Sequence, residues 1–338
     1  MNRSERPIEI IGGGLSGLLL GILLRREKIP CTLYEAGRYP RHRVCGEFLS
    51  GNGVEILRRY DLLNPFLDRG ARWGETAAFF SDRATLREFS LPRPALCLSR
   101  FEMDDVLADL FRERGGILCE DTRVRTGRET EPGVVLAAGR RRKAVDEGWR
   151  WFGLKVHAKG LPLRADLEMH LHDNGYIGAC RIEDNRVNLC GLFRRRVEET
   201  AARESQPHNL LRGPVGSILH EAGGEAEFLE DTFCAVAALD LHPHTALADD
   251  ACRIGDALTM IPPLTGNGMS MALESAAAAA PALVRYSRGE LDWQEAVAQT
   301  GSTIDTRFVS RLSWARRIQQ GLFSPLVRPI LLATGRLC

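Results

Sequence analysis

The chain has 338 residues, of which 44% are hydrophobic and 26% are charged. These fractions are typical of globular proteins, so they exclude a disordered or collagen-like chain, and the length suggests about two domains. The formal net charge of +1 gives no overall field that would attract nucleic acid. We therefore expect no nucleic-acid partner, and any other partner has to be inferred from local features.

The nine cysteines include no Cys-x-x-Cys pair, which in a chain of this length indicates reduced thiols and a cytoplasmic protein. The N-terminus resembles a secretory signal, because basic residues precede an apolar run over 8–24. That run contains five glycines, is short for a membrane span and ends without a small-residue cleavage site. We therefore expect neither a signal peptide nor a membrane helix there.

The first predicted elements are an apolar strand over 8–11, a glycine-rich turn over 12–17 (GGGLSG) and a helix over 18–26. A second strand over 31–34 then delivers Glu35. Glycines that follow a strand, open a helix and precede an acid by about 20 residues are the fingerprint of a dinucleotide-binding unit. The alternative is a glycine-rich turn in any parallel sheet.

The chemistry of this unit explains its residue types. Gly12 permits a tight turn, Gly14 lets the backbone approach a pyrophosphate, and Gly17 lets helix and strand pack closely. The N–H groups at the start of the helix would face the phosphates. Glu35 would accept hydrogen bonds from ribose hydroxyls. The fingerprint alone does not separate NAD from FAD.

The segment after Glu35 favours FAD. Residues 38–50 (RYPRHRVCGEFLS) resemble the loop that follows the ribose acid in the superfamily of geranylgeranyl reductase-like and aromatic hydroxylase-like (group A monooxygenase) flavoproteins. In that superfamily the loop runs along the cofactor. The resemblance therefore implies that Arg41, Arg43, Val44 and Cys45 lie near FAD, although a solvated charge run is the alternative for the arginines.

Two further segments continue the resemblance. Residues 98–104 (LSRFEMD) precede a helix expected over 106–114. The resemblance gives Arg100 the role of the arginine that reaches the flavin. An ordinary explanation of the same residues is that Ser99 and Glu102 form a capping box. A strand expected over 134–138 runs into Gly139, but Ala138 stands where the hydroxylases carry an aspartate linked to FAD and pyridine nucleotide. NAD(P)H or another electron donor therefore stays open as co-substrate. The stretch 126–133 is too short for the usual strand meander, which indicates a compact member.

The second FAD signature of the superfamily is matched by residues 253–257 (RIGDA) and 261–274 (IPPLTGNGMSMALE). The resemblance places Asp256 against the ribityl chain, and the Gly-x-Gly loop over the pyrimidine edge of the flavin. A helix N-terminus there would stabilise the negative charge of reduced flavin. The alternative is an unrelated Pro/Gly loop. Cys45, Pro262 and Pro263 are the candidate catalytic residues. The residues expected to bind FAD are Gly12, Gly14, Leu15, Ser16, Gly17, Glu35, Ala36, Arg41, Arg43, Val44, Arg100, Gly139, Asp256, Gly266, Asn267, Gly268 and Met269.

Short strands are expected over 73–80, 84–89, 151–159, 165–172, 176–182 and 186–193. They predict an antiparallel sheet that forms the floor of a substrate cavity. The expected fold is therefore α/β (α+β), with a Rossmann-like FAD-binding domain interlocked with an antiparallel-sheet substrate domain, of the glutathione-reductase/hydroxylase type. The expected FAD-binding domain comprises 1–70, 95–148 and 245–290, the substrate domain comprises 71–94 and 149–244, and a basic helical segment covers 291–338.

The remaining motifs have ordinary explanations. The pairs His170-x-His172 and His242-x-His244 lack partners at ligand spacing, so no metal is predicted. The segment from Arg307 to Arg336 contains basic and apolar residues and no acid. Such a segment can bind a membrane surface or an acidic carrier protein, or it can be a final helix packed on its own domain.

The sequence thus predicts an FAD-dependent oxidoreductase that acts on a hydrophobic small molecule. Pro262-Pro263 favours monooxygenation, meaning hydroxylation or epoxidation through a flavin hydroperoxide. The first alternative is a geranylgeranyl reductase-like double-bond reductase, favoured by residues 44–47 (VCGE) and Ala138, with Cys45 as proton donor. A second alternative is a non-catalytic FAD-fold protein that binds a ligand or partner. We do not recognise the tryptophan-rich motif or the cavity lysine of flavin-dependent halogenases.

Overall fold

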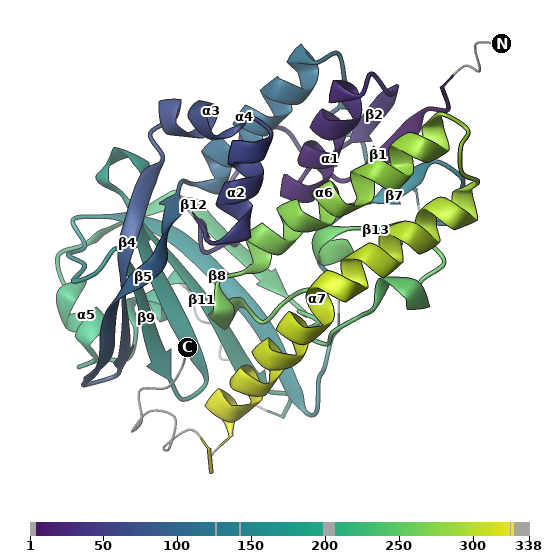
Figure 1. Cartoon of the computed structure of the whole chain (residues 1–338). Coiled ribbons are helices and arrows are strands. Elements are labelled where there is room, and N and C mark those ends of the chain that lie inside the picture. Colours follow the sequence, from purple (N-terminus) through teal and green to yellow (C-terminus); the bar gives the residue numbers. More distant parts are fainter. Residues whose placement is uncertain (1–4, 126, 142, 199–206, 325, 328–338) are drawn as a thin grey trace.

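The computed structural model describes residues 5–125, 127–141, 143–198, 207–324 and 326–327. Two β-sheets organise the molecule, and helices pack on them (Figure 1). The first sheet is parallel, with the strand order β13-β7-β1-β2-β6. Its strands are β1 (Ile8–Ile11), β2 (Cys31–Tyr34), β6 (Ile117–Cys119), β7 (Val134–Leu136) and β13 (Cys252–Arg253).

Helices α1 (Leu15–Arg26), α4 (Arg100–Glu113) and α6 (Gly268–Ser287) form one packed layer with this sheet. Ile8 and Ile10 of β1 are fully buried in the shared core. Gly21 lets α1 approach α4, because a Cβ there would lie 2.7 Å from the Phe111 ring. The β1–α1 turn consequently lies at the carboxyl edge of the central strand, where sheets of this kind bind ligands.

The second sheet has eight strands in the order β12-β8-β11-β10-β9-β4-β5-β3. Its strands are β3 (Phe48–Leu49), β4 (Arg72–Ser81), β5 (Thr85–Cys97), β8 (Trp149–Lys159), β9 (Leu167–His172), β10 (Gly175–Arg181), β11 (Val187–Arg196) and β12 (Glu227–Ala237). All six strands expected from the sequence are present, and β3 and β12 are additional.

One pairing departs from the expected antiparallel sheet, because β4 and β9 run parallel. These strands come from separate stretches of chain, so no hairpin imposes an antiparallel pairing on them. The sheet is therefore mixed. The domain boundaries given above remain a prediction.

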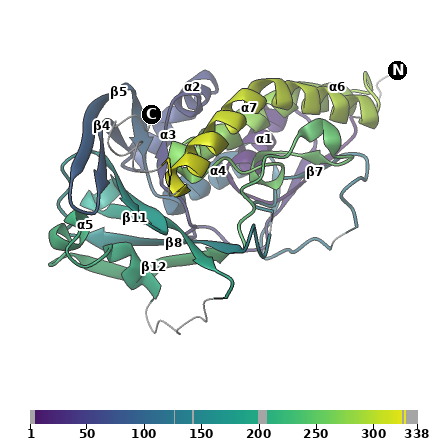
Figure 2. The same cartoon turned by 90° about the horizontal axis from the view of Figure 1, so that it is seen from below.

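The second sheet is covered on both faces. Its outer face packs Leu154, Ile177 and Leu189 against Leu219 of the short helix α5 (Ile218–Ala222). Its inner face packs apolar residues against the end of α7 (Trp293–Phe323), and Figure 2 shows α7 running from α6 to this sheet. Two more helices, α2 (Asn52–Arg59) and α3 (Leu63–Asp68), precede β4.

The start of the predicted basic segment is thus a helix packed on its own protein. A capping box of Asp292 and Glu295 begins α7, and Phe308, Leu312 and Leu322 are buried along it. Arg328 and Arg336 lie outside the described residues, and a membrane or carrier contact stays a prediction. None of the helices in the described part of the chain combines the length and apolar composition that a membrane-spanning segment needs.

Candidate cofactor and catalytic site

The β1–α1 turn has the geometry that the glycine fingerprint predicts. Gly12 has φ +111°, and a Cβ there would lie 2.4 Å from the Ala137 carbonyl oxygen. A Cβ at Gly17 would lie 2.0 Å from the Gly12 carbonyl oxygen. Both glycines are therefore required by packing within the chain. Gly14 differs, because the nearest atom to its Cβ position is the Arg100 Nη2 atom at 3.9 Å.

Gly14 is also the N-cap of α1, and no side chain caps this helix or places an acid in its first turn. The first N–H groups of a helix have no partner within the helix, and its N-terminus carries partial positive charge. Leu15 and Ser16, which form the first turn, are buried. A Cβ position whose one neighbour within 4 Å, among the described residues, is an arginine Nη2 atom, beside an uncapped helix end, suits the approach of an anion.

Glu35 directly follows β2 and is almost fully buried. Its carboxylate accepts hydrogen bonds from the backbone N–H groups of Gly13 (2.8 Å) and Gly37 (3.0 Å). Arg41 and Arg43 form ion pairs with the same carboxylate at 2.6 and 3.3 Å. These two predicted residues therefore contact the acid predicted to bind ribose.

The side chains beside Glu35 fill the rest of this corner. Tyr39 donates a hydrogen bond from its hydroxyl to the Gly13 carbonyl oxygen at 2.5 Å, whereas Ala36 is exposed. Arg43 also lies 3.2 Å from Asp104 of α4.

The two sequence signatures meet at this edge of the sheet. A Cβ at Gly255 would lie 2.6 Å from the Ser16 Oγ atom, so the second signature touches the first turn of α1. Arg100 binds Asp104 through two hydrogen bonds of 2.9 Å, and Asp256 lies 3.6 Å from Arg140 Nε.

Arginines from two other segments act on the carboxylate of Asp256. Burial raises the pKa of Asp256, against the opposing charges of Arg140 and Arg100. Arg100 begins α4 and Arg140 follows β7, so three separate segments of the chain meet here.

The Pro/Gly loop forms a tight turn. The carbonyl oxygen of Pro262 accepts from the Thr265 N–H at 3.2 Å, and that of Pro263 accepts from the Gly266 N–H at 2.9 Å. Both carbonyls are therefore engaged within the turn, and the catalytic role predicted for the two prolines stays a prediction. Gly266 has φ +63°, and a Cβ there would lie 2.3 Å from the Phe48 ring.

This loop leads into a second uncapped helix N-terminus. Asn267 is the N-cap residue of α6, but its side chain donates to the Thr265 carbonyl oxygen instead of capping the helix. Gly268 and Met269 begin the first turn, which contains no acid. The predicted loop therefore offers helix N–H groups to a ligand. Gly139, which follows β7, has φ +84° and an open Cβ position.

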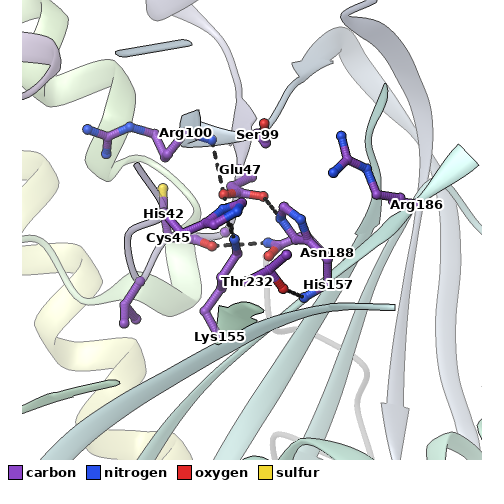
Figure 3. Close-up of polar contacts among 12 residues, drawn as sticks. His42, Cys45, Glu47, Ser99, Arg100, Lys155, His157, Arg186, Asn188 and Thr232 are labelled. Atoms are coloured by element: carbon purple, nitrogen blue, oxygen red, sulfur yellow. Dashed lines mark hydrogen bonds and ion pairs between the residues drawn. The ribbon is translucent and has the colours of Figure 1, made fainter. Parts of the chain in front are cut away.

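A buried polar cluster, which the sequence analysis did not assign, lies where the 42–47 loop meets the second sheet (Figure 3). We define it as His42, Glu47, Lys155, His157 and Asn188. All except His42 are fully buried, and His42 is half-buried. Lys155 and His157 alternate along β8 and so share one face. Asn188 of β11 lies opposite His157 in the sheet register.

Hydrogen bonds and ion pairs connect the cluster. Glu47 contacts His157 Nε2 with Oε2 at 2.6 Å and Lys155 Nζ with Oε1 at 3.3 Å. Lys155 Nζ lies 3.2 Å from His42 Nδ1. The Arg100 backbone N–H also donates to Glu47 Oε1 at 3.0 Å, which connects the cluster to α4.

The charges in the cluster follow from these contacts. Burial alone would raise the pKa of Glu47, but the hydrogen bond from His157 and the charge of Lys155 hold the pKa below its ordinary value. Burial, together with the charge of Lys155, lowers the pKa of His42 to about 4. Near pH 7, Glu47 is therefore a carboxylate and His42 is neutral.

Cys45 lies between the cofactor edge and the cluster. Its thiol is in hydrogen-bond contact with the Arg100 guanidinium, and its carbonyl oxygen accepts from Asn188 Nδ2 at 3.0 Å. Burial raises the pKa of the Cys45 thiol, and the thiol is free. Val44 packs on Gly153 of β8, 3.1 Å from its Cβ position. The loop therefore rests directly on the sheet.

Only a weak signal could have identified the cluster from the sequence. The expected strand over 151–159 places Lys155 and His157 between the apolar residues Leu154, Val156 and Ala158. Charged residues are almost never fully buried unless they are paired. A lysine inside a buried strand therefore indicates a partner, but not which one.

Comparison with curated proteins gives partial matches. No family model matches the chain. The chain is 32% identical to the tetracenomycin B2 monooxygenase-dioxygenase of Streptomyces olivaceus over 81 residues, which are 22% of this chain and 15% of that protein. It is 23% identical to conditioned medium factor receptor 1 of Dictyostelium discoideum over 84% of this chain and 64% of that protein. The chain spans less than two thirds of either relative.

Solved structures match almost the whole chain. PqsL of Pseudomonas aeruginosa, in complex with 2-aminobenzoylacetate, superposes with a TM-score of 0.71 at 17% identity, covering 96% of this chain and 98% of PqsL. The flavin-dependent halogenase CmlS superposes with a TM-score of 0.75 at 22% identity, covering 98% of this chain and 67% of CmlS.

These superpositions define the fold of the chain. The chain has the fold of FAD-dependent monooxygenases and flavin-dependent halogenases. This confirms the predicted fold class and, at the level of the fold, the predicted superfamily resemblance.

Proposed function

We propose that the chain binds FAD and acts as an FAD-dependent monooxygenase on a hydrophobic small molecule. The observation that carries the proposal is the meeting of two signatures that are far apart in the sequence, because the Cβ position of Gly255 lies 2.6 Å from the Ser16 Oγ atom. The matched segment of a curated monooxygenase and the fold of PqsL support the activity.

The residues of the edge fit the chemical groups of FAD. The uncapped start of α1 and the lightly crowded Cβ position of Gly14 suit a pyrophosphate. Glu35 provides a buried carboxylate for ribose hydroxyls, and Asp256 provides a partly exposed one for the ribityl chain. The uncapped start of α6 offers positive potential to a negatively charged ring. When bound, FAD would supply the electron transfer and oxygen activation that side chains lack.

The residues of this chain would then bind, orient and shield the ligand. The inner face of the second sheet carries buried apolar residues, among them Leu171, Tyr176 and Leu192, which pack with the end of α7 and would form the hydrophobic side of a ligand site. The polar cluster at the other end of that face offers hydrogen-bonding groups. The complex of PqsL with 2-aminobenzoylacetate supports a small molecule as ligand.

The cofactor part is tested with purified protein and the variant Gly14→Val. Wild type should be yellow and release FAD on denaturation, or should bind added FAD. Gly14→Val should lose this, because its side chain would take the space above the helix start. Gly224→Val, at an exposed glycine away from this edge whose Cβ position has its nearest neighbour at 3.6 Å, serves as a comparison for general damage. A wild-type protein that neither contains nor takes up FAD contradicts the proposal.

The activity part is tested by product analysis with oxygen isotopes. Reduced protein mixed with oxygen and a ligand should give a product that carries one oxygen atom from the gas. NADH and NADPH are compared as reductants under anaerobic conditions, because Ala138 leaves the donor open. A parallel reaction with added chloride or bromide distinguishes monooxygenation from the halogenation catalysed by halogenases that share the fold. A halogenase would give a product that carries halogen in place of the oxygen atom.

A double-bond reductase is the second candidate, and the position of Cys45 favours it. The thiol lies between Arg100 and the polar cluster, and its raised pKa keeps it protonated. A protonated thiol at that place can deliver a proton to an alkene. Anaerobic reduction of a ligand that is lost in Cys45→Ala would favour this candidate over monooxygenation.

A further inference from the structure

We propose that Gly178 of β10 is the floor of a binding position for a flat aromatic ring, and that it limits the size of ligand that the protein accepts. The inference deepens the proposed function and rests on it for the reaction that the ligand undergoes. A glycine inside a strand weakens the strand, and it often marks a bulge, a bend or a place where a ligand or another backbone approaches closely. Gly178 lies in the interior of β10, so one of these explanations has to apply.

Packing within the chain explains the other glycines in the strands of the second sheet. A side-chain atom lies between 2.4 and 3.3 Å from the Cβ position in four of them: Gly74, Gly153, Gly175 and Gly191. At Gly178 the nearest described atoms are the Cys190 carbonyl oxygen and the Met169 methyl carbon, both at 3.7 Å. The strand pairing is regular through Gly178, and its φ lies outside the left-handed region. Among the described residues, neither packing nor backbone geometry therefore requires a glycine at this position.

Gly178 lies in a row of neighbours that solvent reaches. The register places Met169 of β9 on one side of it and Cys190 of β11 on the other, and all three residues are partly exposed. We call these three residues the Gly178 row. Side chains two positions apart on a strand share a face. On that face the rows on both sides are buried: Leu171, Tyr176 and Leu192, and Leu167, Cys180 and Asn188. The Gly178 row is therefore an accessible strip between two buried rows of the inner face.

The dimensions and chemistry of the Gly178 row suit an aromatic ring. Strands β9 and β11 are two strand spacings apart, about 9.5 Å, and the side chains of Met169 and Cys190 stand on them. Between these side chains Gly178 presents bare backbone, so a flat ring can make close contact with it, whereas a puckered ring touches it with few atoms. The flexible Met169 side chain can move to admit the ring, and its sulfur makes favourable contacts with aromatic groups. These features favour a flat aromatic ligand.

The Gly178 row lies on the side of the sheet that faces the cofactor edge. Tyr176 of the adjacent row belongs to the same apolar cluster as Leu264 of the Pro/Gly loop. Burial raises the pKa of the Cys190 thiol to about 12, against the charge of Arg140 at the cofactor edge. A ring over Gly178 would therefore lie between the sheet and the loop that is predicted to cover the flavin.

The test compares Gly178→Val with wild type and uses two probes that share one carbon skeleton. 2-Naphthol is flat, and decahydro-2-naphthol is puckered. Isothermal titration calorimetry with the purified protein, without reductant, measures both affinities, so no turnover is involved. Wild type should bind 2-naphthol about ten-fold or more tightly than the saturated alcohol. Gly178→Val should weaken the binding of 2-naphthol about ten-fold or more, and Gly178→Ala should weaken it less, because the added methyl groups take the place of the ring.

Thermal unfolding and a matched control separate this effect from damage to the fold. Gly178→Val should melt at or above the wild-type temperature, because valine favours strands and the nearest described atoms are 3.7 Å from the Cβ position. Gly224→Val, at an exposed glycine outside the strands, should bind 2-naphthol as wild type does.

Three results would overturn the proposal. The first is an equal affinity of wild type and Gly178→Val for 2-naphthol. The second is a wild type that binds the two probes equally or binds neither. The third is a Gly178→Val protein that melts well below wild type or does not fold, because the space above Gly178 would then be filled by the protein itself. FAD content and oxygen incorporation are measured separately, so this proposal and the proposed function can fail independently.

Discussion

The substitution Lys155→Met tests whether the buried cluster holds a charged pair. Lys155 and Glu47 are both fully buried, and 3.3 Å separates Nζ from Oε1. Methionine keeps most of the apolar volume of lysine, so the change mainly removes the positive charge. Glu47 would then be a buried carboxylate without its ammonium partner.

The expected loss of stability depends on the hydrogen bonds that Glu47 retains in the variant. Removing one partner of a buried pair costs about 3 to 5 kcal/mol. Glu47 would retain hydrogen bonds from His157 at 2.6 Å and from the Arg100 backbone N–H at 3.0 Å. These bonds continue to stabilise the carboxylate, so we place the loss at the lower end, about 3 kcal/mol.

The assay is urea unfolding followed by circular dichroism, with Lys159→Met as control. Lys159 ends the same strand and is exposed, so its loss should cost little. The double variant Lys155→Met with Glu47→Gln should recover part of the stability, because no uncompensated charge remains. If Lys155→Met costs no more than Lys159→Met, the pair is not charged in the folded protein and the assignment is wrong.

Three further predictions concern the cofactor edge and the loop. Asp256→Ala should weaken FAD binding about ten-fold or more, because a charged hydrogen bond contributes about 1.5 to 3 kcal/mol. Asp250→Ala, at an exposed site, should leave FAD binding unchanged. Equal dissociation constants for the two variants would refute the second signature. The pKa of His42 is about 4 in the folded protein against an ordinary 6.5, so the unfolded chain binds more protons between these values and stability falls as pH falls through this window. His42→Gln should flatten that part of the stability profile, and an unchanged slope in urea titrations would contradict the pKa. Cys45→Ser should leave FAD content and oxygen-dependent turnover near wild type, and a large loss of turnover would give the thiol a chemical role.

The geometry of the carboxyl edge of the parallel sheet was predictable because each part of it is local in sequence, whereas cofactor binding at this edge stays a prediction. The glycines of 12–17 and the acid at 35 belong to one strand–turn–helix–strand unit, and the Gly-Asp and Gly-x-Gly pair belongs to a second. Turn geometry fixes which residue types these positions accept: a Cβ at Gly12 would lie 2.4 Å from a carbonyl oxygen. Such steric constraints restrict these positions to glycine, so the pattern can be recognised from the sequence.

The cluster was not predictable because its partners come from three distant segments. Glu47 belongs to a loop, Lys155 to β8 and Asn188 to β11. Only the docking of that loop on the sheet brings them together, and no spacing along the chain encodes such docking. The parallel pairing of β4 with β9 escaped prediction for the same reason, since the register is set by tertiary packing.

One short loop connects the two sites. Arg41 and Arg43 contact Glu35 at the cofactor edge, whereas His42 and Glu47 contact Lys155 on the sheet. Residues 41–47 therefore carry contacts to both sites. A variant that frees Arg41, such as Glu35→Gln, tests whether the two sites are coupled: if they are, the environment of Lys155 should change although the substitution lies outside the cluster, and an unchanged environment would show that the sites are independent.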